Sequence, residues 1–190
     1  MGLSRSGIVA AAIEILQAYG LADVTMRRVA ETLQVQAGAL YWHVPNKQTL
    51  LALMADEILG QVATPDGAVA PGEWLTSWSH QLLAVLRSYR DSAELVSAVL
   101  ASGLGDVDPI AAPRQLLCQA GAPEPVAAAA THALLQVVLG SLVVEQSRAQ
   151  LAELGVSSAE PAVDSGAVEL GIQLVIEGVL ARLLGEDSKQ

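Results

Sequence analysis

The sequence contains one cysteine, Cys118, and no phenylalanine among its 190 residues. A single cysteine cannot form a disulfide within the chain, which excludes a small secreted fold held by disulfides and fits a reducing compartment. Charged residues make up only 16% of the chain and apolar residues 52%, so the composition excludes a disordered chain. We therefore expect a globular, cytoplasmic protein.

Basic residues are also scarce, with 10 Lys and Arg against 20 Asp and Glu and a net charge of -10. Because phosphate binding normally needs a basic surface, this charge at first disfavours nucleic acid as a partner. The charges are unevenly distributed, with a net +1 over residues 1–50 and -11 over residues 51–190. The charged residues of the first segment are Arg5, Arg27, Arg28 and Lys47 against Glu14, Asp23 and Glu31. This asymmetry is typical of a chain that brings one end to a polyanion.

Residues 126–144 form the longest stretch without Asp, Glu, Lys or Arg, and its length is close to that of a membrane-spanning helix. His132 and Gln136 lie inside the stretch, and Glu124 and Glu145 flank it, which argues against a position in lipid. We predict a helix buried on two faces in a soluble protein, with no membrane partner.

The sequence lacks the alternation of apolar and polar residues that is typical of strands, so we predict an all-α fold. Ser4, Thr25 and Asn46 are expected helix caps, and Gly20 is expected to end the first helix. The expected helices cover residues 4–19, 26–33, 37–43, 47–62, 73–89, 91–101, 109–120, 123–154 and 165–184. The loops expected between modules cover residues 63–72 and 155–164, the second of them mobile.

The two short helices over residues 26–33 and 37–43, under a longer first helix, have the order of a helix-turn-helix. The segment VTMRRVAETLQV, followed by AGALYWHVPNK, resembles the DNA-binding domain of TetR-family regulators over about residues 4–60. The run LYWHV, with Asn46 and Lys47 after it, is especially similar to the tetracycline repressor branch. We therefore expect a helix-turn-helix domain at 1–47, a connecting helix at 48–62, and a helical ligand-binding and dimerisation domain at 63–190.

The resemblance implies a ligand-responsive transcriptional regulator, most often a repressor, that binds a palindromic double-stranded DNA operator as a homodimer. The candidate DNA-binding residues are Thr25, Arg27, Arg28, Gln36, Ala37, Gly38, Ala39, Tyr41, Trp42, His43 and Lys47. A guanidinium can reach phosphate or the two acceptors of guanine, and Gln36 either pairs with adenine or serves as a cap. Tyr41, His43 and Lys47 are expected to bind phosphate, and Trp42 is expected partly to seal the core of the domain.

The residues Ala37, Gly38 and Ala39 depart from the tetracycline repressor branch, whose members usually present larger or polar groups there. Small residues allow close approach of the backbone and methyl contact with thymine, although glycine in a helix costs about 1 kcal/mol relative to alanine. The operator sequence is therefore not implied by the resemblance.

The helices expected at 123–154 and 165–184 carry small and apolar stripes, which favour a four-helix dimer interface over a purely intrachain core. The candidate lining of an effector pocket is largely apolar, a composition that also fits an ordinary core. This lining comprises Trp78, Gln81, Leu82, Val85, Ser97, Leu100, Leu117, His132, Leu135, Gln136 and Leu139.

Ala63 and Ser97 stand where the tetracycline repressor has the histidines that bind its tetracycline–magnesium effector. We therefore expect a small hydrophobic organic effector, with no metal and no cofactor.

Two other functions compete with this reading. An enzyme would use His80 or His132 with Glu145 or Ser141, but the chain has no nucleophile motif, phosphate loop or metal-ligand spacing, so we expect no enzyme. A helical interaction protein with a degenerate helix-turn-helix is the alternative suggested by the acidic charge and the small recognition-helix residues.

Overall fold

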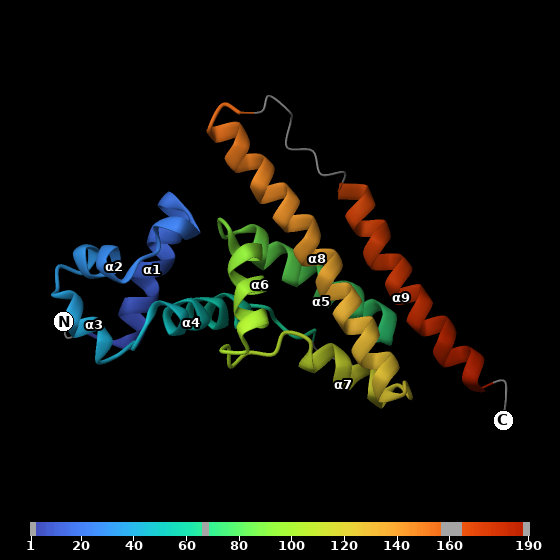
Figure 1. The fold of residues 1–190 in the computed structure, drawn as a ribbon. Coiled ribbons are helices and arrows are strands. Elements are labelled where there is room, and N and C mark those ends of the chain that lie inside the picture. Colours follow the sequence, from blue (N-terminus) through green and yellow to red (C-terminus); the bar gives the residue numbers. More distant parts are fainter. Residues whose placement is uncertain (1–2, 66–68, 157–164, 188–190) are drawn as a thin grey trace. The chain divides into compact units, whose positions relative to one another are not determined.

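A computed structural model describes residues 3–65, 69–156 and 165–187 of the chain. Within these residues every regular element is helical (Figure 1). In chain order the elements are α1 (Arg5–Tyr19), η1 (Leu21–Asp23), α2 (Met26–Thr32), α3 (Ala37–Tyr41), α4 (Lys47–Leu59), α5 (Pro71–Arg87), α6 (Ser92–Ser102), α7 (Ala111–Gln119), α8 (Glu124–Glu153) and α9 (Ser165–Asp187). The all-α prediction is confirmed, and each expected helix is present with ends shifted by a few residues.

The short 3-10 helix η1 was not predicted, and residues 157–164 of the expected mobile loop lie outside the described residues. The chain forms two compact units. The first consists of residues 1–61 and 85–107, and the second of residues 62–84 and 108–190. The first unit therefore includes α6, which sequence analysis assigned to the second module.

Three helices of the first unit begin at a residue whose side chain caps the helix. The Ser4 hydroxyl accepts the Gly7 amide at 3.1 Å, and the Thr25 hydroxyl accepts the Arg28 amide at 3.1 Å. The Asn46 side-chain carbonyl accepts the Thr49 amide at 2.8 Å. Each cap satisfies an amide that has no partner within its helix, so local sequence alone determines where α1, α2 and α4 start.

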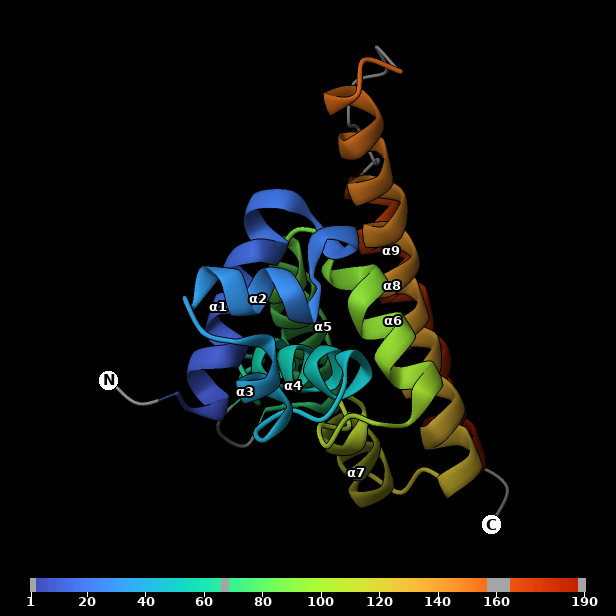
Figure 2. The same cartoon turned by 60° about the vertical axis from the view of Figure 1, so that its left-hand side comes forward.

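In the first unit α4 packs against α1 and α6, and α2 packs against α1 and α3 (Figure 2). The fully buried side chains that fill the core of this unit include Ile8, Leu16, Val29, Leu40, Val44, Leu50, Met54 and Ile58. Trp42 is not among them, because 91% of its surface is exposed. The prediction that Trp42 partly seals this core is wrong: Leu40 and Val44, on either side of the aromatic run, occupy the interior instead.

The turn between α2 and α3 passes through Gln34, which has a φ of 55°. Its amide donates to the Glu31 carbonyl at 3.1 Å, and the Val35 amide donates to the Ala30 carbonyl at 3.0 Å. This left-handed residue ends α2 and reverses the chain into α3. Glycine or asparagine adopts such a φ with less strain than glutamine, so the turn is held by its hydrogen bonds and by packing.

Helix α6 is tied to the rest of the first unit by hydrogen bonds in which two carboxylates accept backbone amides. The Asp91 carboxylate, almost fully buried, accepts the Leu21 amide at 2.8 Å. The Asp56 carboxylate on α4 accepts the amides of Asp106 and Val107 at distances from 2.9 to 3.1 Å. These bonds hold the two ends of the α6 segment to η1 and α4, which explains why α6 belongs to the unit that contains the helix-turn-helix.

In the second unit α8 and α9 run side by side in opposite directions (Figures 1 and 2). Their buried faces repeat at helical spacing, with Leu135, Val138 and Leu142 on α8 and Ile172 and Ile176 on α9. Helices α5 and α7 complete the unit. The first turn of α5 lies against α9 at Gly72, where a Cβ would approach Leu180 Cδ1 to 2.9 Å. The His80 ring on α5 also pairs with the Glu169 carboxylate on α9 at 2.8 Å.

Helix α8 is, among the described residues, the one that is long and apolar enough to cross a membrane, and 44% of its most apolar window is buried. A core helix of a soluble protein passes the same test. Within the chain α8 is buried along one face, rather than on the two faces predicted from sequence. The other face, including Val143 and Val144, is exposed.

Candidate DNA-binding surface

Arg27 lies on the open face of α2, with 88% of its side chain exposed. Its Nε donates to the Glu31 carboxylate one turn later at 2.8 Å. This hydrogen bond and the negative charge of Glu31 raise the pKa of the Arg27 guanidinium. An exposed pair of this kind contributes little to stability, so Arg27 is free to exchange Glu31 for another anion.

Arg28 follows directly in the sequence but is held differently. Its Nη1 donates to the Asp23 carboxylate of η1, and only 33% of its side chain is exposed. The guanidinium carbon lies 3.8 Å from the centre of the Tyr19 ring, at the end of α1. Arg28 therefore connects α2 with both elements that precede it. Neither Asp23 nor Tyr19 was singled out from the sequence, because their proximity to Arg28 depends on how η1 turns the chain.

The surface of α3 is made of small groups. A Cβ added at Gly38 would meet no protein atom within 4 Å, and Ala37 and Ala39 are half-buried beside it. Gln36 occupies the N-cap position with its side chain exposed and without a capping hydrogen bond. Gln36 therefore does not cap α3 through its side chain, and its contact with adenine stays a prediction.

Aromatic and basic side chains follow α3 and lead into α4. Tyr41 is 50% exposed and Trp42 is 91% exposed, whereas His43 and Lys47 are half-buried. A tryptophan so exposed loses no water on folding and so contributes little to the core. The helix-turn-helix thus brings Arg27, Gln36 and this run into one small domain, together with the capping Thr25.

The predicted effector-pocket residues are divided between the two units. Val85, Ser97 and Leu100 belong to the first unit, and the other eight belong to the second. Within the second unit the buried members are Trp78, Leu82, Leu117, Leu135 and Leu139. Gln81 is half-buried there, whereas His132 and Gln136 are exposed on α8.

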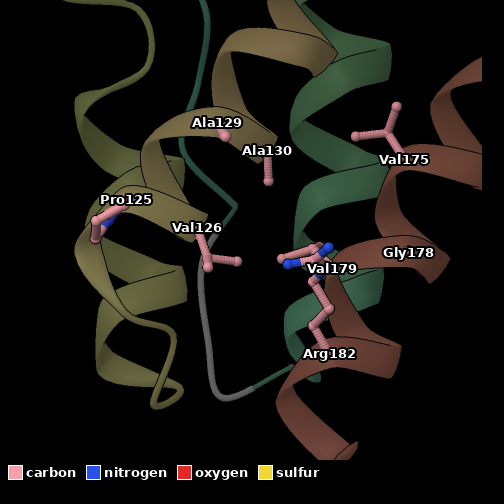
Figure 3. A pocket seen from close by; sticks show the side chains of 8 residues that line it. All are labelled: Pro125, Val126, Ala129, Ala130, Val175, Gly178, Val179 and Arg182. Atoms are coloured by element: carbon pink, nitrogen blue, oxygen red, sulfur yellow. The ribbon is translucent and has the colours of Figure 1, made fainter.

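A hollow of about 450 Å³ lies between the start of α8 and the end of α9 (Figure 3). Its lining residues, none of which was predicted to bind an effector, are Pro125, Val126, Ala129, Ala130, Val175, Gly178, Val179 and Arg182. The Arg182 side chain points into this otherwise apolar hollow from α9 (Figure 3). The signal in the sequence was the run of alanines, which sequence analysis assigned to dimerisation.

Across the described residues, no group of three or more His, Cys, Asp and Glu side chains is placed to hold a metal ion. The Cys118 thiol donates to the Glu124 carboxylate at 3.1 Å, and this bond raises the pKa of Cys118. A thiol held protonated is a poor nucleophile. The two histidines considered for an enzyme site also have hydrogen-bond partners. His80 pairs with the Glu169 carboxylate, and His132 Nδ1 lies 2.9 Å from the Ala128 carbonyl oxygen.

The chain is similar to known proteins in both sequence and fold. Residues 8–54 match the family of bacterial regulatory proteins named tetR. The class A tetracycline repressor of transposon 1721 from Escherichia coli is 27% identical over 96% of this chain and 93% of its own. The crystal structure of Mycobacterium smegmatis BioQ is 37% identical, with a TM-score of 0.85, over 95% of this chain and 99% of BioQ.

A BioQ structure with its double-stranded DNA operator matches with a TM-score of 0.79 at 37% identity, over 94% of this chain and 98% of that chain. The Acinetobacter baumannii TetR variant solved with minocycline is 27% identical, with a TM-score of 0.78, over 96% of this chain and 99% of its own.

The family match includes α2 and α3, which form the helix-turn-helix. The similarity to BioQ also extends over the helices that follow it. This chain and BioQ share 37% of their residues over nearly the whole length of both proteins, so they belong to one family. The chain belongs to the TetR family of bacterial transcriptional regulators and is a DNA-binding protein rather than an enzyme.

Proposed function

We propose that the protein is a cytoplasmic repressor that binds a palindromic operator as a homodimer and leaves it when a small hydrophobic molecule binds the second unit. The observation that carries the proposal is the surface of the helix-turn-helix, where Arg27, Gln36 and Trp42 are exposed and not required by the core. The operator in the BioQ complex and minocycline in the TetR complex support the two kinds of ligand.

The DNA-binding surface combines base-reading and phosphate-binding groups. Arg27 and Gln36 are long polar side chains at the edges of a small-residue surface, so they are suited to base edges in the major groove. Four residues between the end of α3 and the start of α4 are suited to phosphate, which positions the protein without reading sequence. They are Tyr41, Trp42, His43 and Lys47. Thr25 contributes through its cap at the start of α2.

Two substitutions separate these roles. We expect Lys47→Ala to weaken binding to all duplexes alike and to lower the slope of log affinity against log salt by ~1. Arg27→Ala is expected to cost about 1 to 3 kcal/mol and also to relax base preference. Fluorescence anisotropy on a duplex selected by the protein and on random duplex measures both. Equal losses on the two duplexes for Arg27→Ala would show that Arg27 does not read bases.

Gly38 tests whether DNA approaches the surface of α3 closely. The missing side chain is not needed by the protein, because its Cβ would stand in open space. Glycine inside a helix is less stable than alanine by about 1 kcal/mol, so Gly38→Ala is expected to raise the melting temperature.

We expect the same Gly38→Ala variant to lose affinity for DNA, because the added methyl separates the α3 backbone from the base edges. Thermal unfolding and anisotropy on one preparation give both values. A variant that is more stable and binds DNA as tightly as the wild type would contradict the close approach of α3.

The surface of α8 and α9 supports the homodimer. Gly140 and Gly178 lie inside these helices, and a Cβ at either would meet nothing within 4 Å. Each glycine lowers helix stability by about 1 kcal/mol without relieving a contact inside the chain. Leu170 and Leu174 on α9 are more than half exposed. Close packing of the same helices from a second copy would bury both features and fill the hollow beside Gly178.

We expect Gly140→Glu to dissociate the dimer, because it places a charge in a closely packed apolar interface. Sedimentation velocity at micromolar concentration measures the change. Gly38→Glu serves as the matched control, since it adds the same charge at an exposed helical glycine outside the proposed interface. A wild-type protein that sediments as a monomer would contradict the homodimer.

Release by an effector is a linkage between two binding equilibria. Dimer binding to two half-sites requires recognition helices ~34 Å apart, so a change in that spacing lowers DNA affinity. A 100-fold loss requires ~2.7 kcal/mol of difference in effector affinity between the two states, which burial of one or two apolar groups supplies.

A compound that raises the melting temperature in a screen of apolar molecules can be titrated with and without the selected duplex. We expect the duplex to weaken compound binding by the same factor by which the compound weakens DNA binding. Unchanged compound affinity would show that its site is not coupled to DNA.

A further inference from the structure

We propose that Arg28 does not contact DNA but positions α2, and with it Arg27, by holding the corner between α1 and α2 through Asp23 and Tyr19. The inference rests on the proposed DNA-binding surface and differs from the sequence-based expectation that Arg28 binds DNA. Three elements meet at this side chain: the end of α1 at Tyr19, η1 at Asp23, and the first turn of α2.

The contacts of Arg28 use its charge and its planar face at once. Asp23 takes up the charge through Nη1, and the Tyr19 ring lies 3.8 Å from the guanidinium carbon. A planar guanidinium can pair with a carboxylate and stack on an aromatic ring in one conformation, which lysine cannot. Reaching a phosphate would require Arg28 to leave both partners, whereas Arg27 would give up only an exposed neighbour on its own helix.

Asp91, the N-cap residue of α6, also holds this corner. Gly20 has a φ of 90°, and a Cβ there would lie 2.7 Å from the Asp91 carboxylate. The same carboxylate accepts the Leu21 amide at 2.8 Å. The chain between α1 and α2 is therefore held by both Asp91 and Arg28. Because Arg28 belongs to α2, its contacts with Tyr19 and Asp23 tie the first turn of α2 to α1 and η1, in addition to the packing of the buried Met26 and Val29. These contacts set the direction in which α2 presents Arg27.

Removing Asp23 distinguishes positioning from direct contact by the sign of the effect. If Arg28 binds phosphate, Asp23→Asn frees it and removes a negative charge, so DNA binding strengthens. If Arg28 positions α2, the same variant releases the corner and DNA binding weakens. We expect a roughly fivefold loss of affinity, equal to about 1 kcal/mol.

Glu31→Gln is the matched control, because it removes one negative charge from the same domain without touching the corner and is expected to strengthen binding. Arg28→Met is expected to weaken binding by the same factor at every salt concentration, whereas Lys47→Ala lowers the salt slope. Affinities are measured on the duplex that the wild type selects from a random library, well below each variant's melting temperature. A role in stability alone would then leave the affinity unchanged and would overturn the proposal, as would tighter binding by Asp23→Asn.

Amide hydrogen exchange of the free protein separates failure of this proposal from failure of the proposed function. In Asp23→Asn we expect the amides of α2 to exchange faster while those of the α1 interior keep wild-type rates. Unchanged exchange in α2 overturns the positioning role whether or not the wild type binds DNA. A wild type that selects no duplex contradicts the proposed function, and exchange in α2 still decides the role of Arg28.

Discussion

The corner between α1 and α2 is the constraint on which the DNA-binding surface depends. A helix-turn-helix reads DNA only if its first short helix leaves the long helix at one fixed angle. At this corner the chain is held by Val24, whose side chain is fully buried, and by polar contacts at residues 19–23, where Leu21 and Ala22 are not buried. Asp91 and Arg28 add order to the part of the corner that has no buried apolar side chain.

Some of the acidic side chains of this protein have a structural role in the first unit. Three carboxylates of the first unit, those of Asp23, Asp56 and Asp91, are engaged in holding the domain together. The sequence of the first unit holds six Lys and Arg residues against eight Asp and Glu residues, so this unit contributes a net charge of -2 to the -10 of the whole chain. The other 12 of the 20 acidic residues belong to the second unit.

Small residues shape a surface in each of the two units. In α3 the small residues leave a low surface on a domain whose core is complete without them. In α8 and α9, Gly140 and Gly178 leave surface that the chain itself does not cover. Gly38, Gly140 and Gly178 each lower helix stability with no compensating contact inside the chain, which is expected of surfaces shaped for a partner.

The sequence by itself determined the helical class, the order of the helices and the starts of α1, α2 and α4, because capping and periodicity depend on residues only a few positions apart. It also located the helix-turn-helix, since the motif lies in one continuous segment. The exposure of Trp42, the pairing of Arg28 with Asp23 and Tyr19, and the inclusion of α6 in the first unit were decided by tertiary structure. Each depends on how η1 and the α2–α3 turn direct the chain, and no local pattern specifies which of several neighbouring aromatic or basic side chains then faces the core.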